Sequence, residues 1–156
     1  MERTPITKEG YERLKLELQR LQKEERPAVI KAIEEARGHG DLSENAEYEA
    51  AKEKQGLIEG RIQDLCQKLA TSEVIERSDG DNGRAIFGCT VVMEDLETGE
   101  VISYKLVGPW EADVQSGTIS VTSPLGKALI GKEEGEEVNV QAPGGRRTLE
   151  VLQVQG

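Results

Sequence analysis

The sequence is poor in the residues on which most metal centres and thiol chemistry depend. Its 156 residues include one histidine and two cysteines, and the cysteines do not form a CxxC pair. A structural zinc site needs about four such ligands, and disulfides are typical of small secreted domains. Cys66 and Cys89 are therefore expected to be reduced, partly buried thiols.

Basic charge is also scarce relative to acidic charge. The chain has 20 Lys and Arg against 30 Asp and Glu, which gives a formal net charge of -10. Proteins that grip duplex nucleic acid by themselves neutralise its phosphates with Lys and Arg. This balance argues against unaided binding, and if nucleic acid is involved we expect another protein to hold it.

Long apolar segments are missing as well. No run approaches the roughly 18 apolar residues that a membrane-spanning helix needs. The N-terminal MERTPITKEG has neither the basic region nor the apolar core of a secretory signal. We therefore expect a cytoplasmic protein that has no membrane partner.

The two halves of the chain differ in hydrophobic period. In residues 7–37, apolar residues recur at helical spacing. Glu25 falls where a continuous stripe would be apolar, and Pro27 lacks the N–H for a helical hydrogen bond, so a kink or a phase slip is predicted there. Gly38 is the expected stop. The stripe consists of Tyr11, Leu14, Leu18, Leu21, Val29, Ile33 and Ala36.

A second helical pattern runs from about Leu42 to Ala70. The short connection between the two helices predicts an antiparallel coiled-coil hairpin, which forms a domain over residues 1–77. Arms of this length predict a rod of roughly 40 to 45 Å, with GHGDLSEN at its far tip. The apolar stripe of the second helix is Ala51, Ile58, Ile62, Leu65 and Leu69.

Beyond the linker SDGDNGR the period is two, which is typical of strands. AIFGCTVVMEDL and VISYKLVG predict a hairpin around ETGE, TISVTS a further strand, and VNVQAP with RRTLEVLQV a final hairpin. SPLGKALIG predicts one short helix with Ser123 as N-cap, Pro124 in its first turn and Gly131 as its stop. The fold class is therefore α+β, with a small antiparallel sheet domain over residues 78–156.

Asp41 and Glu44, at the predicted tip, have two physical uses. As N-cap and third helical residue they would form a capping box, favoured by the helix dipole. As two hard oxygen donors one helical turn apart, they also suit Mg²⁺ or Mn²⁺. Two carboxylates cannot complete an octahedral shell, so they would form only part of a metal site. The residues alone favour the cap, but the two uses are not exclusive.

Several stretches resemble the Gre family of bacterial transcript-cleavage factors over nearly the whole chain. They are RPAVIKAIEEARGHGDLSENAEYEAAKEKQGLIEGRI, NGRAIFGCTV, ISVTSPLGKALIGKEEGEEV and the closing APGG turn. The resemblance implies a factor that binds backtracked bacterial RNA polymerase and inserts its coiled coil into the secondary channel. It also implies an FKBP-like fold for the second domain.

For the tip, the resemblance implies that Asp41 and Glu44 hold Mg²⁺ jointly with the polymerase and orient the water that cleaves the nascent RNA near its 3′ end. Arg37 and Lys52 would contact phosphates of that RNA. The protein would be a monomer, would hold no Mg²⁺ by itself and would have no nuclease activity alone.

For the second domain, the resemblance implies docking on the polymerase rim through Ser123, Pro124 and Leu125. The alternative for these residues is merely the start of a capped helix. Two rival functions remain: a Gre-like channel blocker that inhibits without stimulating cleavage, and a prolyl isomerase. Because an isomerase pocket is lined with aromatic side chains, the wide spacing of Phe87, Tyr104 and Trp110 argues against the isomerase.

Overall fold

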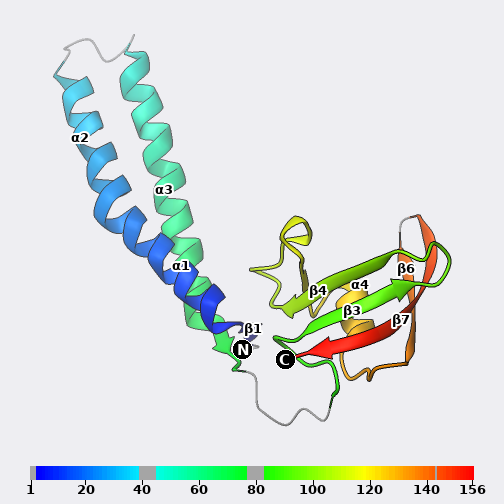
Figure 1. Ribbon diagram of the computed structural model, residues 1–156. Helices are drawn as coiled ribbons and strands as arrows, with labels where there is room; N and C mark the ends of the chain where they lie inside the picture. The colour runs from blue at the N-terminus through cyan, green and yellow to red at the C-terminus, as the bar shows by residue number, and fades with distance from the viewer. Residues whose placement is uncertain (1–2, 39–44, 77–82, 143) are drawn as a thin grey trace. The chain divides into compact units, whose positions relative to one another are not determined.

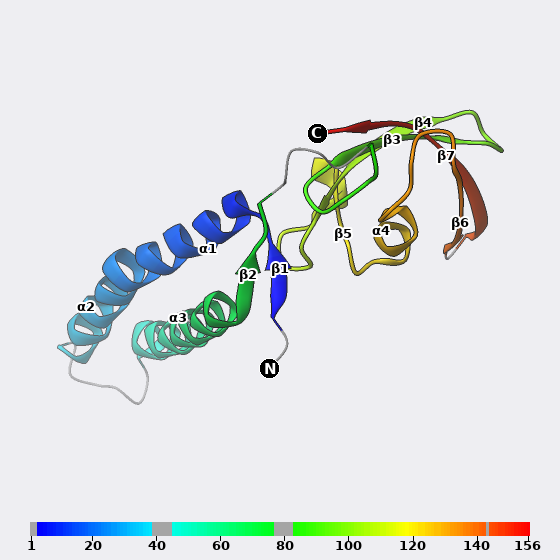
Figure 2. The ribbon, with the colours of Figure 1, turned by 90° about the horizontal axis from the view of Figure 1, so that it is seen from below.

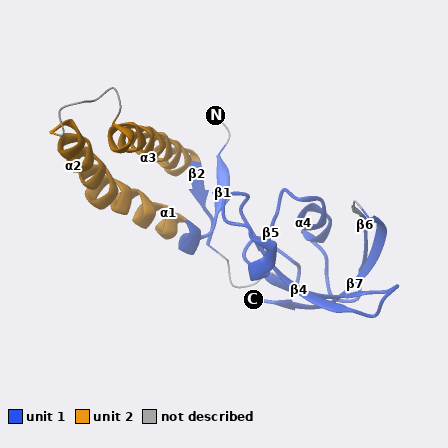
Figure 3. Cartoon of the chain, turned by 90° about the horizontal axis from the view of Figure 1, so that it is seen from above, with its two compact units in different colours: residues 1–10, 72–156 blue, residues 11–71 orange. Residues whose placement is uncertain are grey.

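The computed structural model describes residues 3–38, 45–76, 83–142 and 144–156. The chain divides into two compact units, one formed by Tyr11–Thr71 and the other by Met1–Gly10 together with Ser72–Gly156 (Figure 3). The boundary predicted between residues 77 and 78 lies outside the described residues. None of the helices in the described part of the chain is long and apolar enough to span a bilayer.

The unit Tyr11–Thr71 is a helical hairpin (Figure 1). Its first arm consists of α1 (Lys8–Arg20), the π-helical turn η1 (Leu21–Glu25) and α2 (Arg26–Arg37). Its second arm is the single helix α3 (Ala46–Thr71), which contacts both α2 and η1. The first arm ends at Arg37, as predicted. Gly38 keeps a right-handed backbone with φ of -66°, so this stop does not depend on the conformational freedom of glycine.

The phase slip predicted near Pro27 is confirmed, and it takes the form of a π-helix. The backbone N–H of Arg26 donates to the carbonyl of Leu21, which is one residue further back than in an α-helix. In a regular α-helix, Leu21 and Val29 would point about 80° apart. The wider turn brings both into the core, where they are 6% and 3% exposed.

Most residues of the predicted apolar stripes form or border the hairpin core, whereas Tyr11 and Leu69 are half-buried outside this cluster. Ala36 is also buried, whereas Leu14, Leu18 and Tyr48 are partly buried at the margins. Cys66 follows the buried Leu65 on α3 but is exposed, contrary to expectation. The core cluster comprises Leu21, Val29, Ile33, Ala51, Ile58, Ile62 and Leu65.

Two arginines join the arms through paired hydrogen bonds. Arg26 donates from Nε and Nη2 to the two carboxylate oxygens of Glu59, at 2.8 Å each. Arg61 donates in the same way to Glu17, at 2.7 and 2.9 Å. The hydrogen bonds from these guanidinium groups lower the pKa of Glu17 and of Glu59 below the usual value.

Because of these ion pairs, we expect the free energy of unfolding of the coiled coil to fall in acid. Because the folded-state pKa of Glu17 and Glu59 lies below the unfolded value of 4.5, their contribution is full above that pH and is lost as the pH falls through the folded-state pKa. The double variant Glu17→Gln/Glu59→Gln should melt a few degrees lower at neutral pH. Its melting temperature should also fall less steeply between about pH 5 and pH 3.

Circular dichroism melts over this pH range check the prediction. Glu12→Gln, at an exposed position of α1, is the matched control and should follow the wild type. A double variant that loses stability in acid as steeply as the wild type would show that the two pairs do not contribute.

The other unit contains a five-stranded sheet of order β5-β4-β3-β7-β6. Its strands are β3 (Thr90–Asp95), β4 (Val101–Val107), β5 (Thr118–Ser120), β6 (Glu137–Ala142) and β7 (Gly145–Gln155). Both predicted hairpins, β3–β4 and β6–β7, are confirmed. The prediction of an antiparallel sheet is wrong at one edge: β5 pairs with β4 in parallel, because the chain crosses back through the 3-10 turn Val114–Ser116 before it rejoins the sheet.

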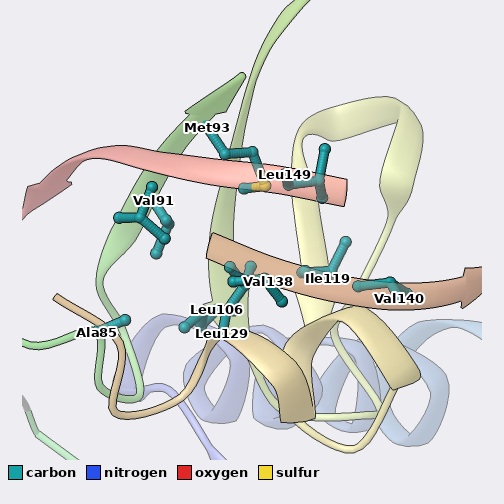
Figure 4. Close-up of a cluster of buried hydrophobic side chains, with 10 residues drawn as sticks. Ala85, Val91, Met93, Leu106, Ile119, Leu129, Val138, Val140 and Leu149 are labelled. Atoms are coloured by element: carbon teal, nitrogen blue, oxygen red, sulfur yellow. The ribbon is translucent and has the colours of Figure 1, made fainter. Parts of the chain in front are cut away.

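The predicted short helix is also confirmed. Helix α4 (Pro124–Leu129) has Ser123 as its N-cap, whose side chain accepts from the backbone N–H of Gly126 at 3.1 Å. Gly131 follows with φ of +85°, a conformation that favours glycine. Figure 4 shows the core between the strands and α4. The cluster comprises Ala85, Val91, Met93, Leu106, Ile119, Leu129, Val138, Val140, Leu149 and Val151.

The sequence did not predict a small parallel sheet made by two remote segments. Strand β1 (Thr4–Ile6) pairs with β2 (Ser72–Val74), and the two lie side by side in Figure 2. Ile6 is fully buried there. The pair joins the segment that leads into α1 to the segment that follows α3.

Candidate functional site: the hairpin tip and the α4 pocket

The acids predicted to do the chemistry, Asp41 and Glu44, lie outside the described residues. In the part of the chain that the structure describes, no three His, Cys, Asp or Glu side chains are grouped so that they could hold a metal ion. The structure does define both flanks of the tip, at the end of α2 and at the start of α3.

The described start of α3 differs from the prediction. The helix begins at Ala46 rather than at Leu42, and its N-cap is Asn45, whose Oδ1 accepts from the backbone N–H of Tyr48 at 3.0 Å. The predicted capping box of Asp41 and Glu44 lies outside the described residues. Asparagine caps as well as aspartate, and its amide can also donate a hydrogen bond, which an ionised carboxylate cannot.

The side-chain amide of Asn45 also donates a hydrogen bond to the first arm of the hairpin. Its Nδ2 donates to the carbonyl of Ala36 at 2.7 Å, and Ala36 lies in the last turn of α2. One side chain thus forms a hydrogen bond with a backbone group at the end of each helix. It joins the two flanks of the segment that carries Asp41 and Glu44.

Replacing Asn45 should separate these two roles. Asn45→Ala loses both hydrogen bonds and should lower the free energy of unfolding of the coiled coil by about 1 kcal/mol. Asn45→Asp keeps the acceptor for Tyr48 but loses the donor to Ala36, so it should melt between Asn45→Ala and the wild type. Thermal melts and amide exchange of Tyr48 measure the effects; rapid exchange in Asn45→Asp would contradict the assigned cap.

The predicted RNA-contact residues are exposed and near the tip. Arg37 is the last residue of α2, and Lys52 lies less than two turns after the start of α3. Both side chains are exposed. Their positions agree with a role in RNA contact, which stays a prediction.

The predicted docking residues lie together at the start of α4. Ser123 donates from Oγ to the carbonyl of Ser120 at 2.6 Å while it caps the helix. A Cβ on Gly126 would meet the same Ser120 carbonyl, so the glycine allows α4 to approach β5 closely. The result is a fixed turn in which Pro124 is exposed.

These three residues line a largely apolar pocket of about 260 Å³. Val114, on the 3-10 turn, contributes a side chain that is 62% exposed, and Tyr104 contributes an aromatic ring from β4. The full lining is Tyr104, Val114, Ile119, Ser123, Pro124, Leu125, Val140, Gln141, Arg147 and Leu149. An exposed apolar pocket of this kind is suited to a protein partner.

Arg147 carries the positive charge among the residues that line the pocket, and it forms an ion pair with the buried Asp95. Its guanidinium forms an ion pair with Asp95 at 3.2 Å, and Asp95 is only 5% exposed. The backbone N–H of Glu97 is the main cause of a lowered pKa for Asp95, followed by the N–H of Thr98 and by Arg147. Asp95 therefore stays ionised, closes the β3–β4 turn and fixes Arg147 beside the pocket.

Known proteins match the chain over both units. Residues 4–74 match the family model "Transcription elongation factor, N-terminal", and residues 80–156 match "Transcription elongation factor, GreA/GreB, C-term". The transcription elongation factor GreA of Syntrophobacter fumaroxidans is 77% identical over 154 residues, which cover 99% of each chain. GreA of Thermodesulfovibrio yellowstonii is 57% identical over 153 residues, or 98% of this chain and 97% of that protein.

A solved structure also matches in sequence. GreA factor homolog 1 of Thermus thermophilus is 34% identical, with 99% of this chain and 100% of that chain covered and a TM-score of 0.45. With both halves matched by family models and full-length relatives above half identity, the chain belongs to the GreA/GreB family of transcription elongation factors.

Proposed function

We propose that the chain binds backtracked bacterial RNA polymerase in the cytoplasm, inserts its hairpin tip into the secondary channel and stimulates the polymerase's own cleavage of the nascent RNA near the 3′ end. The observation that carries this proposal is a long two-helix hairpin in a chain of the GreA/GreB family, with Asp41 and Glu44 in the sequence between its two arms. Cleavage would rescue an arrested complex by providing a new 3′ end.

The length of the hairpin supports such a delivery. Helix α3 alone has 26 residues, which corresponds to about 39 Å. The pairs Arg26–Glu59 and Arg61–Glu17 tie its arms together along this length. A slender rod buries little core for its length, so its reach is the property that function would use.

The donor chemistry of the tip fits Mg²⁺. Carboxylate oxygens are the hard ligands that Mg²⁺ prefers, and the ion commonly shares its shell with water and phosphate. Asp41 and Glu44 offer too few ligands for a complete site, so the polymerase and the RNA would supply the rest. When bound, Mg²⁺ would lower the pKa of water or stabilise the leaving oxygen. The two carboxylates would hold it and orient the water.

The remaining predicted residues have supporting roles in this proposal. Arg37 and Lys52 would contact phosphates of the extruded RNA. Ser123, Pro124 and Leu125 would dock the factor on the polymerase rim, with the pocket at α4 accepting an apolar side chain of the partner. The factor would act as a monomer and would have no nuclease activity alone.

Two rival functions have less support. A channel blocker would not need acids at this spacing, whereas this chain keeps both and its close relatives are named elongation factors. For a prolyl isomerase, the pocket at α4 has one aromatic ring, that of Tyr104, among its lining residues.

An assay on a halted complex tests the proposal. Polymerase is stalled in a backtracked state with labelled RNA, and the protein is added with Mg²⁺. We expect short 3′ fragments to appear and elongation to resume, with no cleavage of free RNA. If no fragments appear and nucleotide addition slows, the protein is a blocker.

A further inference from the structure

Glu111, which follows β4, accepts several hydrogen bonds and has no role in the function proposed above. Its Oε2 accepts from the backbone N–H of Thr7 at 2.7 Å and from the backbone N–H of Gly108 at 3.0 Å. Its Oε1 accepts from the hydroxyl of Thr7. Thr7 and Glu111 lie 104 residues apart in the sequence, yet both belong to the unit that contains the sheet.

Thr7 is the residue from which α1 starts. It is only 6% exposed, and its Oγ1 accepts from the backbone N–H of Gly10 at 3.0 Å, in the manner of an N-cap. The hydroxyl therefore donates to Glu111 and accepts from the first turn of α1 at the same time. Charge-assisted hydrogen bonds of this kind are about twice as strong as neutral ones.

Two glycines make room for the carboxylate. A Cβ on Gly10 would meet the Glu111 carboxylate, and a Cβ on Gly108 would meet the carbonyl of Pro5 and lie 3.0 Å from Oε2 of Glu111. Glycine in a helix costs about 1 kcal/mol relative to alanine. Space for the Glu111 side chain is therefore a structural reason for a glycine in the first turn of α1.

We infer that Glu111 is a positioning residue that anchors the start of the coiled coil. Helix α1 runs without a break from Lys8 to Arg20, and only its first residues belong to the sheet-containing unit. In this proposal, a restraint on the first turn of α1 acts on the rest of this helix. The effect on cleavage rests on the proposed function: loss of the anchor would place the tip acids less accurately while leaving the docking pocket intact.

A distance measurement tests the anchor without polymerase. Spin labels are attached to the exposed Cys66 on α3 and to Ser103→Cys on β4, while Cys89 is shielded by burial. We expect Glu111→Gln to broaden the distance distribution and the exposed control Glu100→Gln to leave it unchanged. Gly10→Ala should broaden it too, because the added Cβ displaces the carboxylate.

Thr7 provides a conservative pair of variants. Thr7→Ser keeps the hydroxyl and should retain the wild-type distance distribution, whereas Thr7→Val should broaden it. The anchor is overturned if Glu111→Gln and Gly10→Ala give the same distribution as Glu100→Gln, or if Thr7→Ser behaves like Thr7→Val. Melting temperatures show that each variant is folded.

A cleavage titration tests the positioning role. In Glu111→Gln the RNA cleavage rate at saturating factor should fall about tenfold, because small misplacements of reacting groups are costly. The half-saturating concentration should stay near that of the wild type. An unchanged saturated rate would refute positioning. If the wild type itself releases no RNA fragments, the proposed function fails, and the distance measurement still decides the anchor.

Discussion

Asp41→Asn and Glu44→Gln should each reduce the stimulated RNA cleavage rate at saturating factor by about a hundredfold or more, the size of effect seen when one preorganised electrostatic contact to a reacting group is lost. Each substitution keeps the shape of the side chain and removes one charge. The amide that replaces the carboxylate is a poorer ligand for Mg²⁺. The measurement is the fragment-release rate in a backtracked complex.

Binding to the polymerase should survive these two substitutions. Either variant should compete with the wild type for the complex, because docking is assigned to the α4 pocket. Glu49→Gln, at an exposed position in the first turn of α3, removes the same charge near the tip and should cleave like the wild type. Equal losses in Glu49→Gln and Asp41→Asn would mean that only the overall charge of the tip matters.

Leu125→Asp should weaken binding to the polymerase without lowering the saturated cleavage rate. Leu125 lines the apolar pocket at α4, and a charge there would have to be desolvated when a partner covers it. Interfaces depend on a few such central residues, so we expect the half-saturating concentration to rise at least about tenfold. The saturated cleavage rate should remain close to that of the wild type.

Leu125 also packs against the sheet core, so a second variant is needed in case Leu125→Asp unfolds. Val114→Asp changes a residue of the same pocket that is 62% exposed, and it should weaken docking without affecting the melting temperature. Leu152→Asp, at an exposed position of β7 outside the pocket lining, is the matched control. If Leu152→Asp weakens docking as much as Val114→Asp, the docking surface lies elsewhere.

Elements whose structure depends on neighbouring residues could be predicted from the sequence. The helical stripes predicted the hairpin core, and the alternating strands predicted both β-hairpins. The absence of an N–H in Pro27 predicted a phase slip, although not its π-helical form. Ser123 and Pro124 predicted the start of α4, because N-cap and first-turn preferences depend only on neighbouring residues.

The sequence contains no local pattern that predicts the pairing of strands that are far apart in the chain. β1 and β2 have three residues each, which is too short for a period to be recognised, and the whole helical hairpin separates them in the sequence. The parallel pairing of β5 depends on the path of the connection from β4 rather than on its own sequence.

The two anchors of the hairpin were missed for different reasons. The helix-start pattern favoured Asp41 because an acid follows three residues later, whereas Asn45 caps α3 because its amide also reaches Ala36. An asparagine directly before a helical run was a usable signal. Glu111 gave no signal, because its partner Thr7 is defined only by the fold.

Localised radical cleavage can show whether Asp41 and Glu44 come close to the catalytic metal of the polymerase, as proposed. Fe²⁺ replaces Mg²⁺ in the backtracked complex, and peroxide then produces radicals that cut the protein backbone near the bound iron. We expect cuts in the factor close to Asp41 and Glu44, suppressed by excess Mg²⁺ and absent without polymerase. Cuts confined to the sheet domain, or none in the factor, would contradict it.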